Sequence, residues 1–265
     1  MNARSAGRQS SVASRQSSPP LGIIGGSGLT ELSGLESARR KAVRTPYGRT
    51  SGLLTLGRIG GRGIVFLPRH GYRHTLLPHE VNYRANLWAL HAQKVRDVVA
   101  IASVGGIRSE LIAGTLAIPD QILDYTHGRE STYYGAGGRG IAHIDFTRPY
   151  CEGLRGRLQR AAARAGATVF AGGTYATTQG PRLESAAEID RLERDGADMV
   201  GMTGMPEAAL ARELGMCYAT IAVVVNDAAG RRASADEVRL DADRALQAMA
   251  RVRRILDELA ASDGG

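Results

Sequence analysis

The chain has 265 residues, of which 43% are apolar, and a formal net charge of +8. This length accommodates one large α/β domain or two small ones. No eighteen successive residues are apolar, so no transmembrane helix and no membrane partner are expected. Two cysteines are too few for a disulfide framework, and a reducing, cytoplasmic location fits this usage best.

The positive charge is distributed in a way that argues against nucleic-acid binding. Arg4, Arg8 and Arg15 lie in an N-terminal stretch without acidic residues, and elsewhere basic residues alternate with acidic ones, as in residues 191–195. No helix-turn-helix, zinc-finger or RNA-recognition pattern occurs. An anionic small-molecule substrate accounts better for the arginines that follow strands.

Residues 1–20 are rich in Ser, Arg and Gln, end in Pro19-Pro20 and show no apolar pattern. This composition predicts a disordered extension. It superficially resembles a transit peptide but lacks a clear amphipathic face. The folded domain is therefore predicted to span residues 21–265.

The domain begins with a short apolar strand at Leu21 that enters a glycine turn, Gly25-Gly26-Ser27-Gly28. Such turns let backbone N–H groups and a hydroxyl surround an anion. The dinucleotide fingerprint would need a glycine where Glu31 stands, and the lysine of a phosphate-binding P-loop is missing. Taken alone, this turn is a weak indicator of function.

A second candidate is the cationic loop that follows the strand predicted at residues 64–67, which forms a hairpin with residues 53–59. It contains Arg69 and three of the six histidines, at positions 70, 74 and 79, and a helix follows from about Asn82. Open α/β sheets bind ligands at such strand ends. Arg69 offers a planar fork of donors for an oxyanion, and His70 could donate a further hydrogen bond. The alternatives are a solvated basic loop or a metal site, but the histidine spacing matches no common zinc pattern.

The rest of the chain alternates strands and helices. Strands are expected at 98–104, 115–123, 168–175, 198–202 and 217–225, a polar loop at 124–139, and helices at 152–165, 185–195, 206–214 and from about 234 to 259. Ser185 with Glu188, and Ser234 with Glu237, form capping-box patterns. No linker-like composition interrupts this alternation, so a single α/β domain is predicted.

Several polar residues share one position, at the end of an otherwise apolar strand. They are Ser27, Arg69, His70, Ser103, Thr203 and Asn226. Each alone is more commonly an ordinary loop residue or helix cap. Together, hydroxyls, an arginine and backbone N–H groups make an anion cradle that needs no metal. Nucleophilic hydrolysis lacks support because no Gly-x-Ser-x-Gly elbow occurs.

Six segments, in this order, resemble the purine nucleoside phosphorylase family, nearest to its methylthioadenosine/methylthioinosine phosphorylase branch. They are residues 25–29 (Gly-Gly-Ser-Gly-Leu), 45–48 (Thr-Pro-Tyr-Gly), 69–71 (Arg-His-Gly), 81–86 (Val-Asn-Tyr-Arg-Ala-Asn), 178–182 (Thr-Gln-Gly-Pro-Arg) and 202–207 (Met-Thr-Gly-Met-Pro-Glu). The resemblance implies a single-domain nucleoside phosphorylase fold, with a mixed, partly barrel-like β-sheet flanked by helices. It also implies a homotrimer, which could pair into a hexamer, with sites at subunit interfaces.

The resemblance further implies phosphorolysis, a pentosyl transfer in purine salvage that uses inorganic phosphate as co-substrate and no cofactor or metal. Matched position by position, the implied phosphate-binding residues are Ser27, Arg69, His70, Ala102, Ser103 and Thr203. Met202 would lie against the ribose, and His143 would reach the 5′ pocket of a neighbouring subunit. The implied catalytic residues are His70 and Asn226, the latter placed against purine N7.

Two positions point to a 6-oxopurine. The adenine-specific branch has aspartates where this chain has Asn226 and Ala228, and an Asn can donate to a 6-oxo group while it accepts from a protonated N7. Glu184, after Leu183, matches a glutamate of the 6-oxopurine enzymes and suits the N1 proton of hypoxanthine. Asp227 leaves an alternative open, because its carboxylate could face the purine instead.

The 5′ end points to a methylthio group. Ordinary nucleoside phosphorylases use a histidine where this chain has Ala235, and Val238 lies one turn further on, so an apolar pocket is expected. The predicted substrate is S-methyl-5′-thioinosine, ahead of inosine or guanosine and then of methylthioadenosine. A hydrolytic nucleosidase and a non-catalytic nucleoside-binding module remain alternatives, distinguished by whether base release requires phosphate.

Deletion of residues 1–20 tests the predicted extension. Because these residues show no apolar pattern, the shortened chain is expected to keep the melting temperature and activity of the full chain. Thermal unfolding and base release measured on both chains check this. A large drop in melting temperature would show that the extension packs on the domain.

Overall fold

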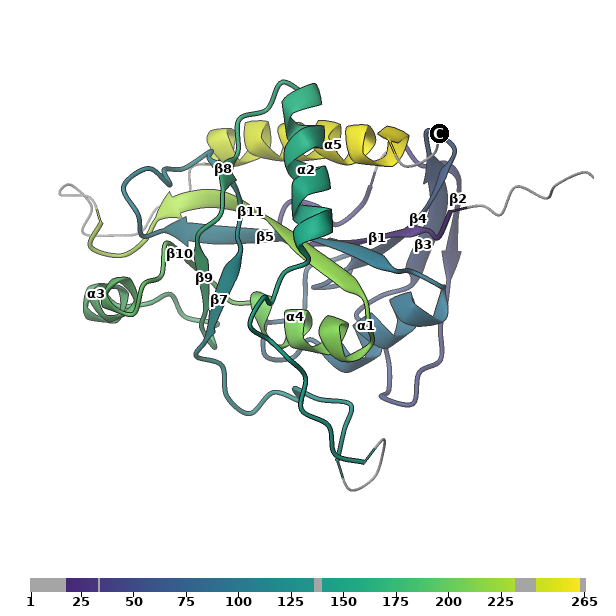
Figure 1. The fold of residues 1–265 in the computed structure, drawn as a ribbon, viewed down its shortest axis with the longest axis horizontal. Coiled ribbons are helices and arrows are strands. Elements are labelled where there is room, and N and C mark those ends of the chain that lie inside the picture. The colour runs from purple at the N-terminus through teal and green to yellow at the C-terminus, as the bar shows by residue number, and fades with distance from the viewer. Residues whose placement is uncertain (1–17, 33, 136–139, 232–241, 263–265) are drawn as a thin grey trace, which may run out of the picture.

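The fold is seen in a computed structural model, which describes residues 18–32, 34–135, 140–231 and 242–262 (Figure 1). The extension predicted at residues 1–20 lies almost wholly outside these ranges, as does the capping pattern of Ser234 and Glu237. Among the described residues, no helix is both long enough and apolar enough to span a membrane.

Strand β5 (Asp97–Gly106) is the centre of the sheet. Strand β1 (Leu21–Gly25) pairs with its first half in parallel, and β11 (Cys217–Asp227) runs parallel along its other edge. All three are apolar runs with little alternation, because helices cover both faces of the sheet. This confirms the strands predicted here, although β5 and β11 each end two residues later than expected and β5 begins one residue earlier.

The other strands extend this centre into one eleven-stranded mixed sheet. An antiparallel set joins β1 through β4: β2 (Glu36–Lys41), β3 (Leu54–Ile59) and β4 (Arg62–Pro68). Beyond the second half of β5 lie β10 (Met199–Gly201), β9 (Thr174–Thr177) and β7 (Gln121–Asp124), while β6 (Leu116–Ile118) and β8 (Phe170–Ala171) follow β11. The predicted single-domain α/β class with a mixed sheet is confirmed.

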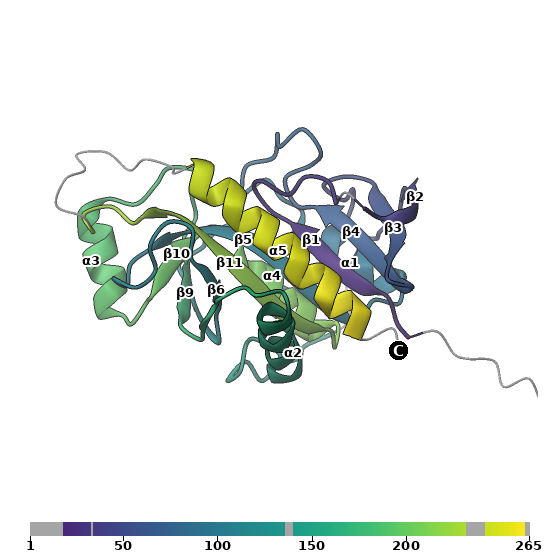
Figure 2. The same cartoon turned by 90° about the horizontal axis from the view of Figure 1, so that it is seen from above.

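Helices cover the sheet on two sides (Figures 1 and 2). Helices α2 (Glu152–Arg164) and α5 (Ala242–Ser262) lie on one face, and α1 (Tyr83–Ala92) and α4 (Gly204–Glu213) on the other. Helix α3 (Ala186–Arg194) lies at one end of the molecule and begins with the predicted capping box of Ser185 and Glu188.

The two faces of the sheet bury two separate apolar cores. Along β1, Ile23 packs in the core under α2 and α5, while Ile24 packs in the core under α1 and α4. Val99 and Val98 of β5 divide in the same way. Alternation along a strand thus sends successive apolar side chains to opposite cores.

Two of the predicted strands are each broken into two. Residues 115–123 form β6 and β7, interrupted at Pro119, which lacks a backbone N–H group. Residues 168–175 form β8 and β9, interrupted at Gly172 and Gly173, both with positive φ. Pro119-Asp120 and Gly172-Gly173 were the sequence signals for these two breaks.

The two cysteines form a disulfide, which the sequence analysis did not expect. Cys151 immediately precedes α2 and Cys217 begins β11, with their Cα atoms 5.2 Å apart. The backbone N–H of Cys151 donates to Tyr218 O at 2.8 Å, so the two segments also meet through the main chain. A disulfide is more typical of oxidising compartments than of a reducing cytoplasm. The cytoplasmic location stays a prediction.

Replacement of both cysteines by alanine tests the contribution of this bond. Closing a loop of this length restricts the unfolded chain, so the double variant is expected to lose about 2–4 kcal/mol in the free energy of unfolding. Urea denaturation with and without a reducing agent measures this. Reduction should destabilise the wild type to the same extent and leave the double variant unchanged; an equal response of both would contradict the stabilising role.

Candidate active site

A cavity of about 300 Å³ opens where several strands end at one edge of the sheet. The strands β1, β4, β5, β10 and β11, or the turns that follow them, all contribute. Its lining includes Ser27, Arg69, His70, His74, Ser103, Gly105, Leu183, Glu184, Met202, Thr203, Val225, Asn226 and Ala228. The structure therefore brings together most of the predicted site residues. Ser103 and Asn226 lie within β5 and β11 rather than just beyond them.

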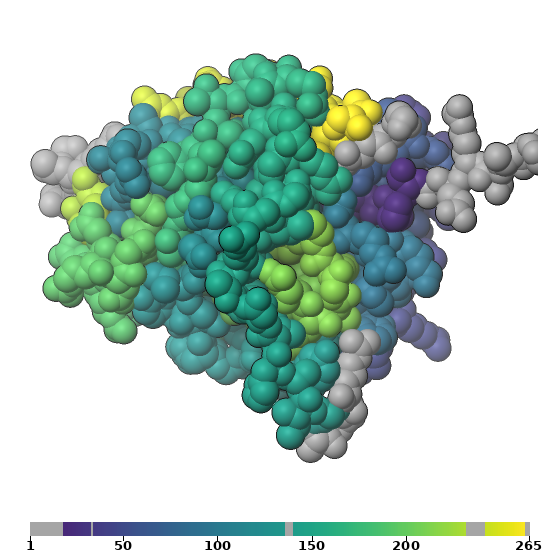
Figure 3. All heavy atoms as spheres, viewed as in Figure 1, coloured from purple at the N-terminus to yellow at the C-terminus, as the bar shows by residue number. Residues whose placement is uncertain are grey.

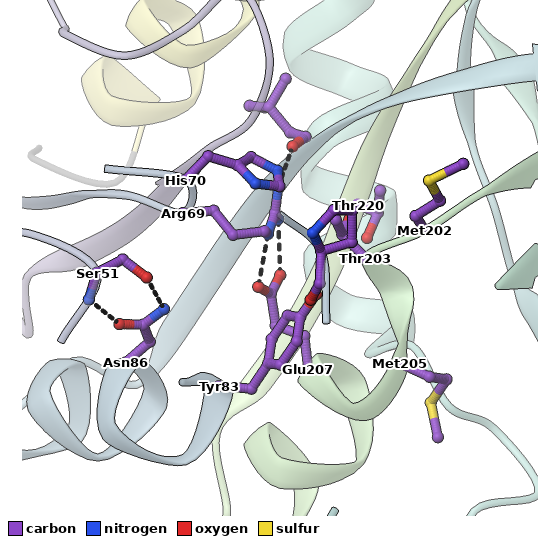
Figure 4. A network of polar contacts seen from close by, with 12 residues as sticks. Ser51, Arg69, His70, Tyr83, Asn86, Met202, Thr203, Met205, Glu207 and Thr220 are labelled. Atoms are coloured by element: carbon purple, nitrogen blue, oxygen red, sulfur yellow. Dashed lines mark hydrogen bonds and ion pairs between the residues drawn. The ribbon is translucent and has the colours of Figure 1, made fainter. Parts of the chain in front are cut away.

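Arg69 is fully buried at the wall of this cavity and is held by three internal hydrogen bonds, of which Figure 4 shows the two to Glu207. Its Nε and Nη2 donate to the Glu207 carboxylate at 2.7 and 2.8 Å, and Nη1 donates to Ile101 O at 2.8 Å. A guanidinium has five N–H donors, so two remain for a ligand. The fork of donors that was predicted to suit an oxyanion is thus partly engaged, because Glu207 occupies one edge of it.

Glu207, at the start of α4, is a residue to which the sequence analysis gave no role. Its side chain is completely buried and also accepts a hydrogen bond from Tyr218 Oη at 2.8 Å. Burial alone would lower the pKa of Arg69, but the attraction and hydrogen bonds of Glu207 outweigh it, so the pKa is raised. A single carboxylate within an apolar segment could have indicated this pair, because a buried charge requires a partner.

His70 has a defined tautomer. Its Nδ1 lies 2.8 Å from Leu76 O, and a carbonyl oxygen only accepts, so Nδ1 carries the proton. Burial, and then the charge of Arg69, lowers the pKa of His70 to about 4. The ring is therefore neutral near pH 7, and its Nε2 accepts a hydrogen bond. The donor that the sequence analysis assigned to a ligand is engaged by Leu76.

Three hydroxyl residues complete this end of the cavity. Ser27 Oγ lies 3.5 Å from His74 Nε2, and Ser103 Oγ lies 3.5 Å from Ser27 O. Thr203 directly precedes α4, whose backbone is non-helical at Met205 and regular only beyond it. Gly26 makes this convergence possible, because a Cβ there would lie 2.4 Å from Ile101 O. The arrangement suits a small oxyanion.

A different set of groups lies at the other end of the cavity. The register of β11 against β5 shifts between Val224 and Asn226, and such a bulge re-aims the side chains beyond it. Asn226 and Ala228 line the cavity, whereas Asp227 lines a neighbouring cavity with Arg231. Asn226, rather than Asp227, is therefore the residue placed to meet a ligand.

Glu184 approaches the same end from the loop between β9 and α3. Its Oε1 accepts a hydrogen bond from Thr178 Oγ1 at 2.5 Å, while Leu183 beside it is half exposed. An amide and a carboxylate at one end of a cavity can together recognise a base that carries both donors and acceptors.

Two further predicted residues, Ala102 and His143, do not line this cavity. Ala102 packs in an apolar cluster within the sheet. His143 is exposed, so a contact with a neighbouring subunit stays a prediction. Ala235 and Val238 lie outside the described residues. Within the ranges that the structure describes, no three His, Cys, Asp or Glu side chains are grouped to hold a metal ion.

Residues 20–261 match the model of the Phosphorylase superfamily, and the chain belongs to this family. The predicted membership of the nucleoside phosphorylases, a class of pentosyl-transferring enzymes, is thereby confirmed.

Individual relatives agree with this membership. A protein of Pseudomonas syringae pv. tomato named probable S-methyl-5′-thioinosine phosphorylase is 52% identical over 79% of this chain and 85% of its own length. The 6-oxopurine nucleoside phosphorylase of Pyrococcus furiosus is 45% identical over 80% of this chain and 81% of its own. A solved structure, methylthioadenosine phosphorylase from Schistosoma mansoni in complex with adenine, has a TM-score of 0.86 and 32% identity, covering 92% of each chain.

Arg69→Ala is expected to lower the free energy of unfolding by about 3–5 kcal/mol, because it leaves Glu207 buried without its cation. The double variant Arg69→Met/Glu207→Gln removes both charges and should recover most of this loss.

If Arg69 also binds phosphate, the double variant still requires far more phosphate for half-maximal rate. Urea unfolding and phosphate saturation curves separate the two effects, and a double variant with wild-type phosphate saturation would place the anion elsewhere.

Proposed function

We propose that this enzyme cleaves the N-glycosidic bond of a 6-oxopurine nucleoside with inorganic phosphate, and that its preferred substrate is S-methyl-5′-thioinosine. The products are hypoxanthine and 5-methylthioribose 1-phosphate. One observation supports the proposal: the lining of a single cavity includes Ser27, Arg69 and Thr203 together with Asn226 and Glu184.

The proposed chemistry needs no protein nucleophile. A phosphate oxygen forms a bond to C1′ of the ribose as the bond from C1′ to purine N9 breaks, and the bonding electrons leave with the purine. Catalysis then depends on holding phosphate close to C1′ and on stabilising charge on the departing base. The two free donors of Arg69 and the hydroxyls of Ser27 and Thr203 would hold the phosphate, and Met202 would face the ribose.

His70 adds a constraint on the phosphate. Since its Nε2 accepts rather than donates, it pairs with a phosphate oxygen that still carries a proton. Hydrogen phosphate has such an oxygen, whereas a fully deprotonated anion does not. His70 therefore provides a neutral acceptor for the phosphate, while Arg69 provides a positive charge and hydrogen-bond donors.

The purine end distinguishes a 6-oxo from a 6-amino base. The Asn226 amide can donate to O6 while its oxygen accepts from a protonated N7. The Glu184 carboxylate can accept the N1 proton of hypoxanthine, whereas adenine has a lone pair at N1 that would repel it. This favours hypoxanthine as the leaving base over adenine.

We further propose a homotrimer, which could pair into a hexamer, in which His143 and the predicted apolar positions Ala235 and Val238 complete the 5′ pocket. The segment between β7 and α2 runs across one face of the molecule and projects from it (Figure 3). Ile141, two residues before His143, is 88% exposed. An exposed apolar side chain on a projecting segment supports contact with a second subunit.

Product analysis tests the function. Methylthioinosine, methylthioadenosine, inosine and guanosine are each incubated with the enzyme, with and without phosphate. The expected result is release of hypoxanthine from methylthioinosine, at the highest efficiency of the four, as a sugar 1-phosphate forms. Free sugar without phosphate would indicate a hydrolase, and no product would indicate a binding module.

Asn226→Asp is expected to lose methylthioinosine activity. The 6-oxo group would then face a carboxylate in place of its donor, which costs about 1–3 kcal/mol. This corresponds to roughly a tenfold to hundredfold fall in relative efficiency. Adding Glu184→Ser should then permit methylthioadenosine to be used, as measured by kcat/KM for both nucleosides.

Asp227→Asn is the matched control for this change, because Asp227 lines the neighbouring cavity. The base preference of this variant should equal that of the wild type. If Asp227→Asn changes the preference and Asn226→Asp does not, Asp227 is the residue that faces the purine.

A further inference from the structure

Two separate loops supply the two ends of the candidate site. The Glu184 loop, residues 178–184, follows β9 and reaches the purine end of the cavity. We call residues 202–205 the Thr203 loop: they follow β10 and include the first two residues of α4, of which Met205 has non-helical backbone angles. Met202 and Thr203 of this loop line the cavity at its proposed phosphate end. Since a nucleoside and phosphate must be held at a fixed separation, the relative position of these loops matters for the reaction.

The side chain of Arg129 lies between the two loops and binds both. It belongs to the segment after β7 and is half-buried. On the Glu184 loop, its Nη2 donates to Gln179 O at 2.9 Å and Thr178 O at 3.3 Å, and its Nε donates to Gln179 Oε1 at 3.1 Å. On the Thr203 loop, its Nη1 donates to Met202 O at 2.9 Å and Met205 O at 2.7 Å.

These bonds engage both loops through one planar group. Nη1 also lies 3.3 Å from Tyr83 Oη, and the guanidinium carbon lies 5.6 Å from the centre of the Tyr83 ring. Within the described part of the chain, the hydrogen-bond partners of Arg129 are carbonyl, amide and phenol oxygens, all of them neutral. An arginine that serves as a surface ion pair would instead meet a carboxylate.

Two of the carbonyl groups that accept from Arg129 belong to residues that either line the cavity or bond directly to a residue that lines it. Thr178, whose carbonyl accepts from Arg129, donates through Oγ1 to the Glu184 carboxylate at 2.5 Å. Met202, whose carbonyl also accepts from Arg129, lines the cavity and directly precedes Thr203. A shift of the guanidinium would therefore move the purine end and the phosphate end relative to each other.

We propose that Arg129 is a positioning residue that sets the distance between the purine-binding and the phosphate-binding halves of the site. This inference rests on the proposed function. Arg129 itself is not among the residues that line the cavity. Arginine is required because its planar fork reaches acceptors on two loops at once, whereas lysine carries a single compact donor group.

The proposal predicts a kinetic effect for Arg129 variants that variants at only one end of the site should not show. Arg129→Met should raise the KM for both the nucleoside and phosphate, and lower kcat/KM by about a hundredfold, because small misplacements of reacting groups are that costly. Thr178→Val removes the hydroxyl that donates to the Glu184 carboxylate at 2.5 Å and lies 3.3 Å from Gly201 O, and it leaves all the hydrogen bonds of Arg129 in place. It should raise the KM for the nucleoside alone.

The experiment measures steady-state constants at 25 °C for the nucleoside that the wild type uses best, with the melting temperature of each variant as a second readout. Arg164→Met is the matched control, because Arg164 binds the Glu258 carboxylate and carbonyl on the far face of the protein, each at 3.1 Å. This control loses an arginine that also joins two segments. Its KM values should equal those of the wild type.

A lowered melting temperature with both KM values unchanged in Arg129→Met would overturn the proposal and leave Arg129 a structural residue. Should that variant not fold, Arg129→Lys carries the test: it keeps the charge but cannot bridge both loops, so both KM values still rise. Wild-type constants in the lysine variant would also overturn the proposal. An inactive wild type would refute the proposed function itself, which is a separate outcome.

Discussion

The buried ion pair between Arg69 and Glu207 is the interaction on which the candidate site depends. It joins the end of β4 to the start of α4, across 138 residues of sequence, with both side chains almost inaccessible to solvent. A buried pair is not by itself a strong source of stability, because both charges are desolvated, but losing one partner is costly. Its value here is geometric: Glu207 and Ile101 O fix the guanidinium so that its remaining donors face one direction.

The architecture then gathers other groups around that fixed cation. Because β1, β4, β5 and β11 run parallel to one another, their carboxyl ends meet at the same edge of the sheet. Ser27 and Ser103 reach this edge from two of these strands, and Thr203 reaches it from the start of α4. This combination of hydroxyls and one arginine suits the hydrogen phosphate that we propose as co-substrate. Neutral His70 limits the total positive charge and supplies an acceptor.

The opposite end of the cavity is organised by deviations from regular structure. A bulge in β11 separates Asn226 from Asp227, so neighbouring polar residues serve different cavities. Glu184 depends on a loop rather than a strand, and this loop is held by Thr178 and Arg129. The two ends are thus supported by different loops, which leave the paired strands β9 and β10, and Arg129 contacts both loops.

Much of this protein was determined by local sequence. Apolar runs such as residues 98–104 predicted strands buried on both faces, because such a strand has apolar side chains on both sides. The capping box at Ser185 predicted the start of a helix. Most of the polar residues at strand ends could be predicted to form one site, because the carboxyl ends of parallel strands meet at the same edge of a sheet. Tertiary structure alone decided the features that depend on distant partners. The burial of Glu207 against Arg69, the disulfide of Cys151 and the hydrogen bonds of Arg129 join segments far apart in the chain, and no local pattern specifies which distant groups will meet.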